Sequence, residues 1–158
     1  MHDLTTAYLL LLLGGATSML IGGLLLTGGL TAPVAVRVLD EASAARFLRA
    51  FWPRYYAIGA VGGLLMMCAS VALALVGPFG VVYGSALVMI SALFITGLWL
   101  PLRLTPVLNA ARDAGDAARF ARLHQLVLAL TGASLLFGAA WLVALGWVLP
   151  AQYGMQHG

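Results

Sequence analysis

Five sulfur-containing side chains lie near the middle of long apolar stretches of the sequence: Met19, Met66, Met67, Cys68 and Met89. Thioether and thiolate sulfur are soft ligands that select soft ions such as Cu(I). If three helices present sulfur at one depth, the candidate metal ligands are Met66, Cys68 and Met89. The simpler interpretation is structural, because Met fills irregular gaps and a free Cys behaves as a small apolar residue. We therefore predict no cofactor, with a Cu(I)-like metal as the alternative.

His124 is the second residue that could do chemistry, because it follows Arg119 and Arg122 at the start of the last apolar stretch. Imidazole can ligate haem or change its charge near neutral pH. The other histidines, His2 and His157, lie near the two ends of the chain. The simpler interpretation is a hydrogen-bonded histidine at a membrane interface. A haem-binding redox subunit that uses His124 is a second alternative.

The basic residues form the third candidate, and all of them are arginines in two short segments. Such a collar of guanidinium groups could hold anionic lipid headgroups. The simpler interpretation is that the arginines only set the membrane topology. Together with His124, the predicted lipid or interface residues are Arg37, Arg46, Arg49, Arg54, Arg112, Arg119 and Arg122, and Arg103 lies beside them.

No motif of a soluble enzyme is present: the sequence has no GxGxxG, Walker lysine, HExxH or GxSxG. The acidic residues lie outside the apolar stretches, whereas proton-coupled carriers place an ionisable group within a span. We therefore predict that the protein is not an enzyme and not a proton-coupled carrier. The acidic residues are Asp3, Asp40, Glu41, Asp113 and Asp116.

The composition predicts a membrane protein. Of 158 residues, 63% are hydrophobic and only 8% are charged, against about a quarter charged in soluble domains. Three uncharged stretches cover residues 4–36, 55–102 and 123–158. A spanning helix needs about 20 apolar residues, and the middle stretch holds a turn signal at Gly77–Gly80. The sequence predicts an all-α, multi-pass protein with four transmembrane helices in an up-down bundle, near residues 6–32, 56–76, 81–100 and 126–149.

The two arginine-rich connections are each expected to contain an amphipathic helix in the interface. Asp40 is expected to cap the first one, which Pro53 would end, and Pro33 would end the first span. The second is expected over Asn109–Leu123, with Asp116 paired to Arg112 and Arg119. Glycine steps in the spans are expected to allow close helix contacts and, through them, a homo-oligomer.

The arginine distribution also predicts an orientation, because positively charged loops stay in the cytoplasm. Both connections are then cytoplasmic and both termini lie outside, which separates His124 from His2 and His157. The expected location is a bacterial inner membrane. The net charge of +3 is assigned to topology and lipid contact, so we predict no nucleic-acid partner.

The chain is expected to form a single membrane domain, residues 1–158, made of two helical hairpins, 1–76 and 81–150. A shift of 73 residues aligns the two arginine-rich segments without a gap: Pro33 meets Pro106, Asp40 meets Asp113, and Arg46-Phe47 meets Arg119-Phe120. An internal duplication explains this match, and chance in an Ala- and Arg-rich sequence is the alternative.

Several short motifs carry a family resemblance: Pro33-Val34-x-x-Arg37-x-Leu39, Phe51-x-Pro53-x-Tyr55-Tyr56, Pro106 with Asn109, and Arg119-Phe120-x-Arg122-Leu123-His124. The chain resembles the transmembrane protein 205-like family, domain of unknown function 4149. That resemblance implies about four spans with polar cytoplasmic connections and, for bacterial members, no assigned activity. The eukaryotic member is associated with resistance to platinum drugs, which sulfur ligands would suit.

Three functional interpretations follow. The preferred one is a four-helix inner-membrane protein with a structural, accessory or lipid-interacting role. The alternative is transport of, or tolerance to, a soft metal or a metal-containing compound. The second alternative is the haem-binding redox subunit.

Overall fold

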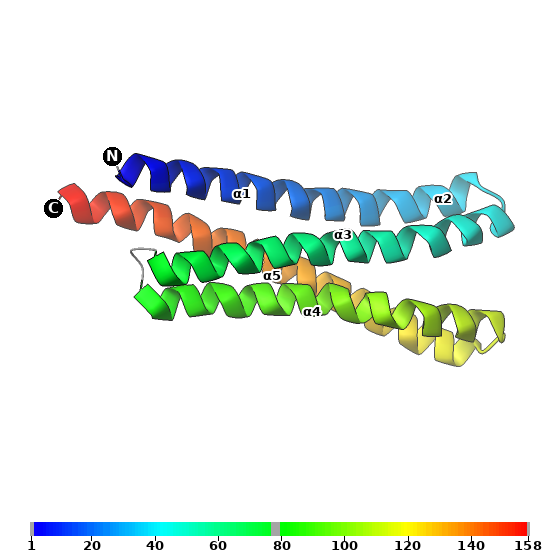
Figure 1. Ribbon diagram of the computed structural model, residues 1–158. Coiled ribbons are helices and arrows are strands. Elements are labelled where there is room, and N and C mark those ends of the chain that lie inside the picture. Colours follow the sequence, from blue (N-terminus) through cyan, green and yellow to red (C-terminus); the bar gives the residue numbers. More distant parts are fainter. Residues whose placement is uncertain (1, 77–79, 158) are drawn as a thin grey trace.

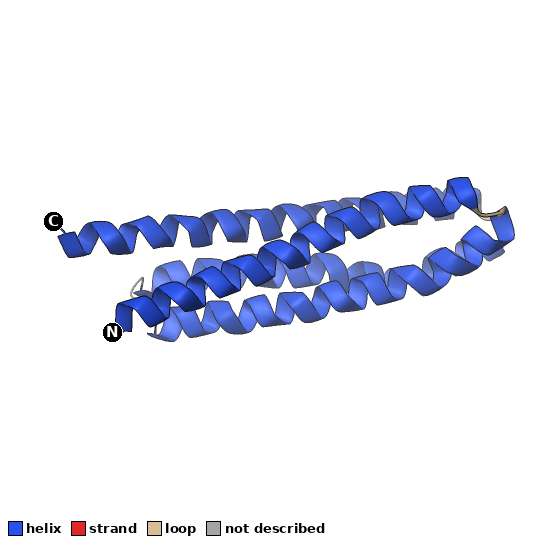
Figure 2. Cartoon of the chain, turned by 90° about the horizontal axis from the view of Figure 1, so that it is seen from above, coloured by secondary structure: helices blue, strands red, loops and turns tan. Residues whose placement is uncertain are grey.

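The structure is a computed structural model that describes residues 2–76 and 80–157. The chain forms four long rods with no strand among the described residues, as predicted (Figures 1 and 2). The first rod joins α1 (His2–Leu26), the π-helical segment η1 (Thr27–Thr31) and α2 (Ala32–Val38). The other rods are α3 (Glu41–Val76), α4 (Gly80–Asp113) and α5 (Ala117–His157).

Each rod is long and apolar enough to cross a membrane, so the protein is a multi-pass membrane protein. The four candidate spans are Leu11–Val38, Glu41–Leu75, Val81–Asp113 and Ala117–Trp147. The α2–α3 and α4–α5 connections lie at one end of the bundle, and both chain termini lie at the other (Figure 1). The arginines flank these two connections along the sequence, and we call this end of the bundle the arginine end. Of the predicted turn at Gly77–Gly80, residues 77–79 lie outside the described residues, and Gly80 begins α4.

The prediction of two separate interfacial helices is wrong. The residues expected to form the first one are the opening turns of α3, which continues through Pro53 to Val76. Pro53 removes only one backbone hydrogen bond, and aromatic side chains on both sides of it hold the helix together. Phe51 and Trp52 contact Tyr55 with ring centroids 5.8 and 5.4 Å apart.

The prediction that Pro33 ends the first span is also wrong. Pro33 does not end the first rod but stands in the first turn of α2, where proline is well accommodated. Pro101 and Pro106 both lie inside α4. Spanning helices tolerate proline when neighbouring helices pack against the site, and Pro101 is fully buried.

A tight turn replaces the helix expected over Asn109–Leu123. The Gly115 amide donates to the Arg112 carbonyl and the Asp116 amide to the Ala111 carbonyl, which together form a Schellman motif. Gly115 has a φ of 69°, a conformation that glycine adopts without steric cost. The turn therefore ends α4 and reverses the chain into α5.

Aspartates begin the two helices that leave the arginine end. Asp40 accepts a hydrogen bond of 2.9 Å from the Ser43 amide at the start of α3, as predicted. Asp116 accepts one of 3.0 Å from the Arg119 amide at the start of α5. The side-chain pairs predicted for Asp116 with Arg112 and Arg119 are wrong, because Asp116 caps the helix. In the described part of the chain the ion pair is instead Arg49 with Asp113.

A small polar network lies at the centre of α3, α4 and α5. The Ser70 hydroxyl lies 3.0 Å from that of Ser91 and accepts a hydrogen bond of 2.9 Å from the Trp141 indole. Ser134 donates to the Phe94 carbonyl at 2.8 Å. All of these residues are fully buried, so the network joins the three helices where water is absent.

Glycines bring these three helices close together, as the sequence predicts. A Cβ on Gly63 of α3 would lie 2.9 Å from the Phe94 ring, and one on Gly97 of α4 would lie 2.8 Å from the Ser134 side chain. Most glycines of the first rod make no such contact within one chain, and the homo-oligomer predicted through glycine faces stays a prediction. A Cβ on Gly15, Gly22 or Gly29 would meet no atom within 4 Å, so α1 is the more loosely held helix.

Candidate functional site

The π-helical segment of the first rod lies beside Tyr55 of α3. The Tyr55 hydroxyl donates a hydrogen bond of 3.0 Å to the Leu24 carbonyl, just before the segment begins. A Cβ on Gly28 would lie only 3.0 Å from the Tyr55 hydroxyl oxygen. Because Gly28 has no side chain, the phenol ring can reach the backbone of the first rod. π-Bulges in helices are frequent at functional sites.

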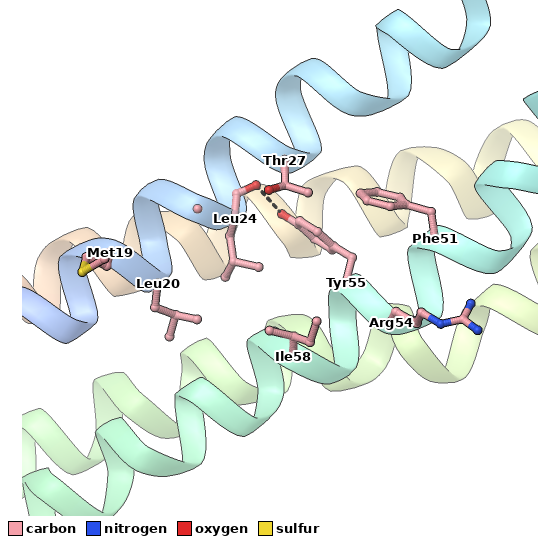
Figure 3. Close-up of a pocket in the computed structure, with 9 residues that line it drawn as sticks. Met19, Leu20, Leu24, Thr27, Phe51, Arg54, Tyr55 and Ile58 are labelled. Atoms are coloured by element: carbon pink, nitrogen blue, oxygen red, sulfur yellow. Dashed lines mark hydrogen bonds between the residues drawn. The ribbon is translucent and has the colours of Figure 1, made fainter. Parts of the chain in front are cut away.

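A groove opens between the first rod and α3 next to this contact (Figure 3). Its volume is about 410 Å³. Met19 and Leu20 line it on the side of the chain termini, and Phe51 and Arg54 line it towards the arginine end. Gly23 also lines it. The other lining residues are Leu24, Thr27, Tyr55 and Ile58.

The groove is apolar along its length and has one cation at one end. From Met19 to Thr27 the helix rises about 12 Å, at roughly 1.5 Å per residue. Arg54 is exposed and extends away from the apolar lining (Figure 3), and its guanidinium donates to the Ala50 carbonyl at 2.6 Å. Long basic side chains reach the interface in this way while their stems stay on apolar surface.

The candidate sulfur ligands do not share one surface of the bundle. Met66 is 2% exposed and belongs to the core, whereas Met89 is 61% exposed and Cys68 is exposed. Residues two apart on a helix differ by about 200° in direction, so Met66 and Cys68 point to different sides of α3. Among the described residues no group of three or more His, Cys, Asp or Glu could hold a metal ion.

The predicted interface arginines all lie near the arginine end with exposed side chains. Arg49 of α3 donates to Asp113 of α4, one of the two bonds being 3.0 Å. Arg46 donates to Ser43 at 3.1 Å, and Arg122 donates to the Ala118 carbonyl at 3.4 Å. The remaining exposed members of the set are Arg37, Arg112 and Arg119.

His124 lies in a smaller cavity together with two of these arginines. Its ring stacks on Phe120, with centroids 5.7 Å apart. Arg49 and Arg112 line the same cavity, which lies between α3, α4 and α5. The structure therefore brings three of the predicted residues together, from three different helices.

Sequence reasoning missed the groove and the role of Tyr55. The available signal was the pair Gly28-Gly29 followed by Pro33, which was interpreted as the end of a span. A π turn has no strong sequence signature, because it depends on which side chain of the neighbouring helix approaches it.

The comparison with protein families adds one finding. A family model described as Domain of unknown function (DUF4149) matches residues 15–117. The chain belongs to this family. The match covers both walls of the groove in this DUF4149 protein. Among curated proteins and among solved structures, no match is found. The narrower likeness to transmembrane protein 205 stays a prediction.

Proposed function

We propose that this DUF4149 protein is a non-enzymatic, lipid-interacting membrane protein that holds an anionic phospholipid between its first rod and α3. One acyl chain occupies the groove, and the phosphate lies beside Arg54. The observation that carries this proposal is the groove itself, which is apolar from Met19 onwards and has a cation at the end nearest the arginine end.

The direction of the groove supports a lipid over a compact apolar ligand. A phospholipid has an anionic headgroup at the interface and chains that run towards the centre of the bilayer. The groove has the same polarity, because Arg54 lies towards the arginine end and Met19 lies towards the chain termini. A juxtamembrane arginine attracts anionic lipid with about 1 kcal/mol. The groove is not an enclosed cavity, so an acyl chain can enter it.

The test is to fill the groove. A Cβ on Gly23 meets no atom within 4 Å, so Gly23→Leu is accommodated and its side chain occupies the groove. We expect at least a tenfold loss of phosphatidylglycerol retained by the purified protein, measured by native mass spectrometry. Gly15→Leu is the matched control, because Gly15 has equally open surroundings and does not line the groove. Equal lipid retention by these two variants would refute the proposal.

Arg54→Gln tests the headgroup contact separately. The preference for phosphatidylglycerol over phosphatidylcholine is expected to fall about fivefold, as the loss of about 1 kcal/mol implies. Retention of phosphatidylcholine should not change, since its headgroup carries no net charge. If the parent protein retains both lipids equally, the anionic part of the proposal is wrong.

We also propose that the protein lies in a bacterial cytoplasmic membrane with the arginine end in the cytoplasm and both termini outside. The support is that the arginines flank the two connections and that positive loops stay inside. In a Cys68→Ala background, a cysteine introduced by Ala114→Cys should react with an impermeant maleimide only after the cells are permeabilised. Labelling of intact cells would reverse the orientation.

The two other functions stay predictions. Metal analysis of protein loaded with Cu(I) tests the soft-metal function, and Cys68→Ala together with Met89→Leu should abolish any bound ion. An absorption spectrum tests the haem function, which requires a Soret band. The separated positions of Met66 and Cys68 do not favour the soft-metal function, and they do not bear on the haem function.

A further inference from the structure

The cavity around His124 is distinct from the groove. It lies between α3, α4 and α5 at the arginine end and has a volume of about 120 Å³, compared with about 410 Å³ for the groove. Arg49, Arg112 and His124 line it together with Asn109, and its apolar wall includes Trp52 and Val127. Its size suits a headgroup-sized ligand better than an acyl chain.

Three of the polar residues that line the cavity have hydrogen-bonding groups to spare. The side chains of Asn109, Arg112 and His124 form no hydrogen bond or ion pair with any other residue in the described part of the chain. An arginine has five N–H donors, and the asparagine amide supplies two more. Arg49 directs part of its guanidinium to Asp113, which leaves its other N–H groups available. Hydrogen-bond donors that have no partner therefore line this cavity from three helices, α3, α4 and α5.

The acidic residues nearby do not cancel this positive charge. Asp113 is already bonded to Arg49, and Asp116 accepts the hydrogen bond that caps α5. No carboxylate in the described part of the chain forms a hydrogen bond or ion pair with Arg112, although Asp113 interacts with it electrostatically. A charged acceptor makes shorter and stronger hydrogen bonds than a neutral one, and guanidinium groups match the geometry of phosphate oxygens.

We propose that this cavity is a binding site for a phosphate-type oxyanion. The ligand accepts hydrogen bonds from Arg112 and Asn109, with Arg49 and His124 beside it, while the apolar wall of Trp52 and Val127 excludes water from one side. Two sources share this chemistry: a free phosphate from the aqueous phase and the headgroup of a phospholipid. The site does not depend on the groove, because no residue lines both.

The experiment uses the full chain in phosphatidylcholine nanodiscs with radiolabelled inorganic phosphate in equilibrium dialysis. Binding should saturate in the presence of chloride at matched ionic strength. Arg112→Gln should weaken it at least tenfold, because a charge-assisted hydrogen bond is removed. Arg103→Gln is the matched control, since the Arg103 guanidinium lies 4.6 Å from the Trp99 ring centroid and outside the cavity.

A second set of nanodiscs, containing phosphatidic acid, distinguishes the two sources. Saturable binding of free phosphate identifies an aqueous ligand. Retention of phosphatidic acid alone, reduced tenfold by Arg112→Gln and not by Arg103→Gln, identifies a headgroup. If Arg112→Gln does not fold, Asn109→Leu replaces it with the same expected loss. Absence of both kinds of binding, or equal effects of the Arg112 and Arg103 variants, would overturn the proposal.

Discussion

The Tyr55 hydroxyl donates a hydrogen bond of 3.0 Å to the Leu24 carbonyl, across the contact between α3 and the first rod. Both residues are buried, and the bond lies at the point where the α-helix gives way to η1. It joins the most loosely packed rod to the rest of the bundle. Leu24 and Tyr55 also line the groove. This single contact therefore affects both the stability of the protein and the proposed lipid site.

Removing that hydroxyl by Tyr55→Phe should cost about 1 kcal/mol in the free energy of unfolding, the usual net value for such a bond in a membrane protein. Denaturant titration in mild detergent measures it. The control is Tyr8→Phe, because Tyr8 is 66% exposed and its substitution should change stability little.

Gly28→Ala tests the close approach at the same place. The new Cβ would lie 3.0 Å from the Tyr55 hydroxyl oxygen, so either the ring or the helix must shift. The loss of stability should be smaller in the Tyr55→Phe background, where that oxygen is absent. If Gly28→Ala lowers the stability equally in the parent protein and in Tyr55→Phe, Gly28 and the Tyr55 hydroxyl do not interact.

The turn between α4 and α5 should depend on one glycine. Gly115→Ala forces a side chain into the left-handed conformation and is expected to destabilise the protein by about 1–2 kcal/mol. Gly132→Ala is the comparison, because Gly132 lies inside α5 and a Cβ there meets nothing within 4 Å. That variant should be neutral or slightly stabilising. Thermal unfolding compares the two variants. If Gly132→Ala were less stable than Gly115→Ala, the assignment of the turn would be wrong.

The buried indole of Trp141 should matter far more than an exposed one. Trp141→Phe loses the bond to Ser70 and part of the packing, so a cost of about 1–2 kcal/mol is expected. Trp147 is 75% exposed, and Trp147→Phe should stay within about 0.5 kcal/mol of the parent. Unfolding followed by near-UV circular dichroism compares the two variants.

Acid should weaken the cap of α3. The hydroxyl and the amide of Ser43 hold the pKa of Asp40 below its ordinary value of 3.8. A carboxylate with a lowered pKa stabilises the folded state above the unfolded pKa, and this contribution disappears as the pH falls through the folded pKa.

Asp40→Asn is the matched variant, because its amide oxygen can still cap the helix but does not titrate in this range. The difference in stability between parent and variant should shrink below a pH of about 4. A difference that stays constant from pH 7 to pH 3 would show that the Asp40 charge contributes nothing.

The sequence was sufficient to predict the coarse fold, because apolar stretches indicate which segments lie in lipid and arginines indicate which segments lie at the aqueous interface. Four spans and a shared arginine end follow from residues 4–36, 55–102 and 123–158 being uncharged. The proline positions misled the local assignment. Pro33, Pro53 and Pro106 are signals of helix ends in water, but each lies within a helix here: Pro33 in the first turn of α2, Pro53 inside α3 and Pro106 inside α4.

The site was only partly predictable for a different reason. Arg49, Arg112 and His124 could be selected as polar residues beside the spans, yet their meeting in one cavity depends on how three helices pack. The groove depends on the approach of Tyr55 to Leu24, two residues that are 31 positions apart. The aligned aspartates Asp40 and Asp113 also differ in role, one as a cap and one as an ion-pair partner, so the internal duplication stays a prediction.

The looseness of α1 has a consequence for biogenesis. This helix leaves the ribosome before α3 and α5, the two helices that it packs against. A Cβ on Gly138 of α5, for example, would lie 2.8 Å from the side chain of Ile21 of α1. After its insertion, α1 therefore stays partly unpacked in the lipid until α5 has been inserted. During that interval chaperones and quality-control proteases of the membrane can reach the apolar surface of α1.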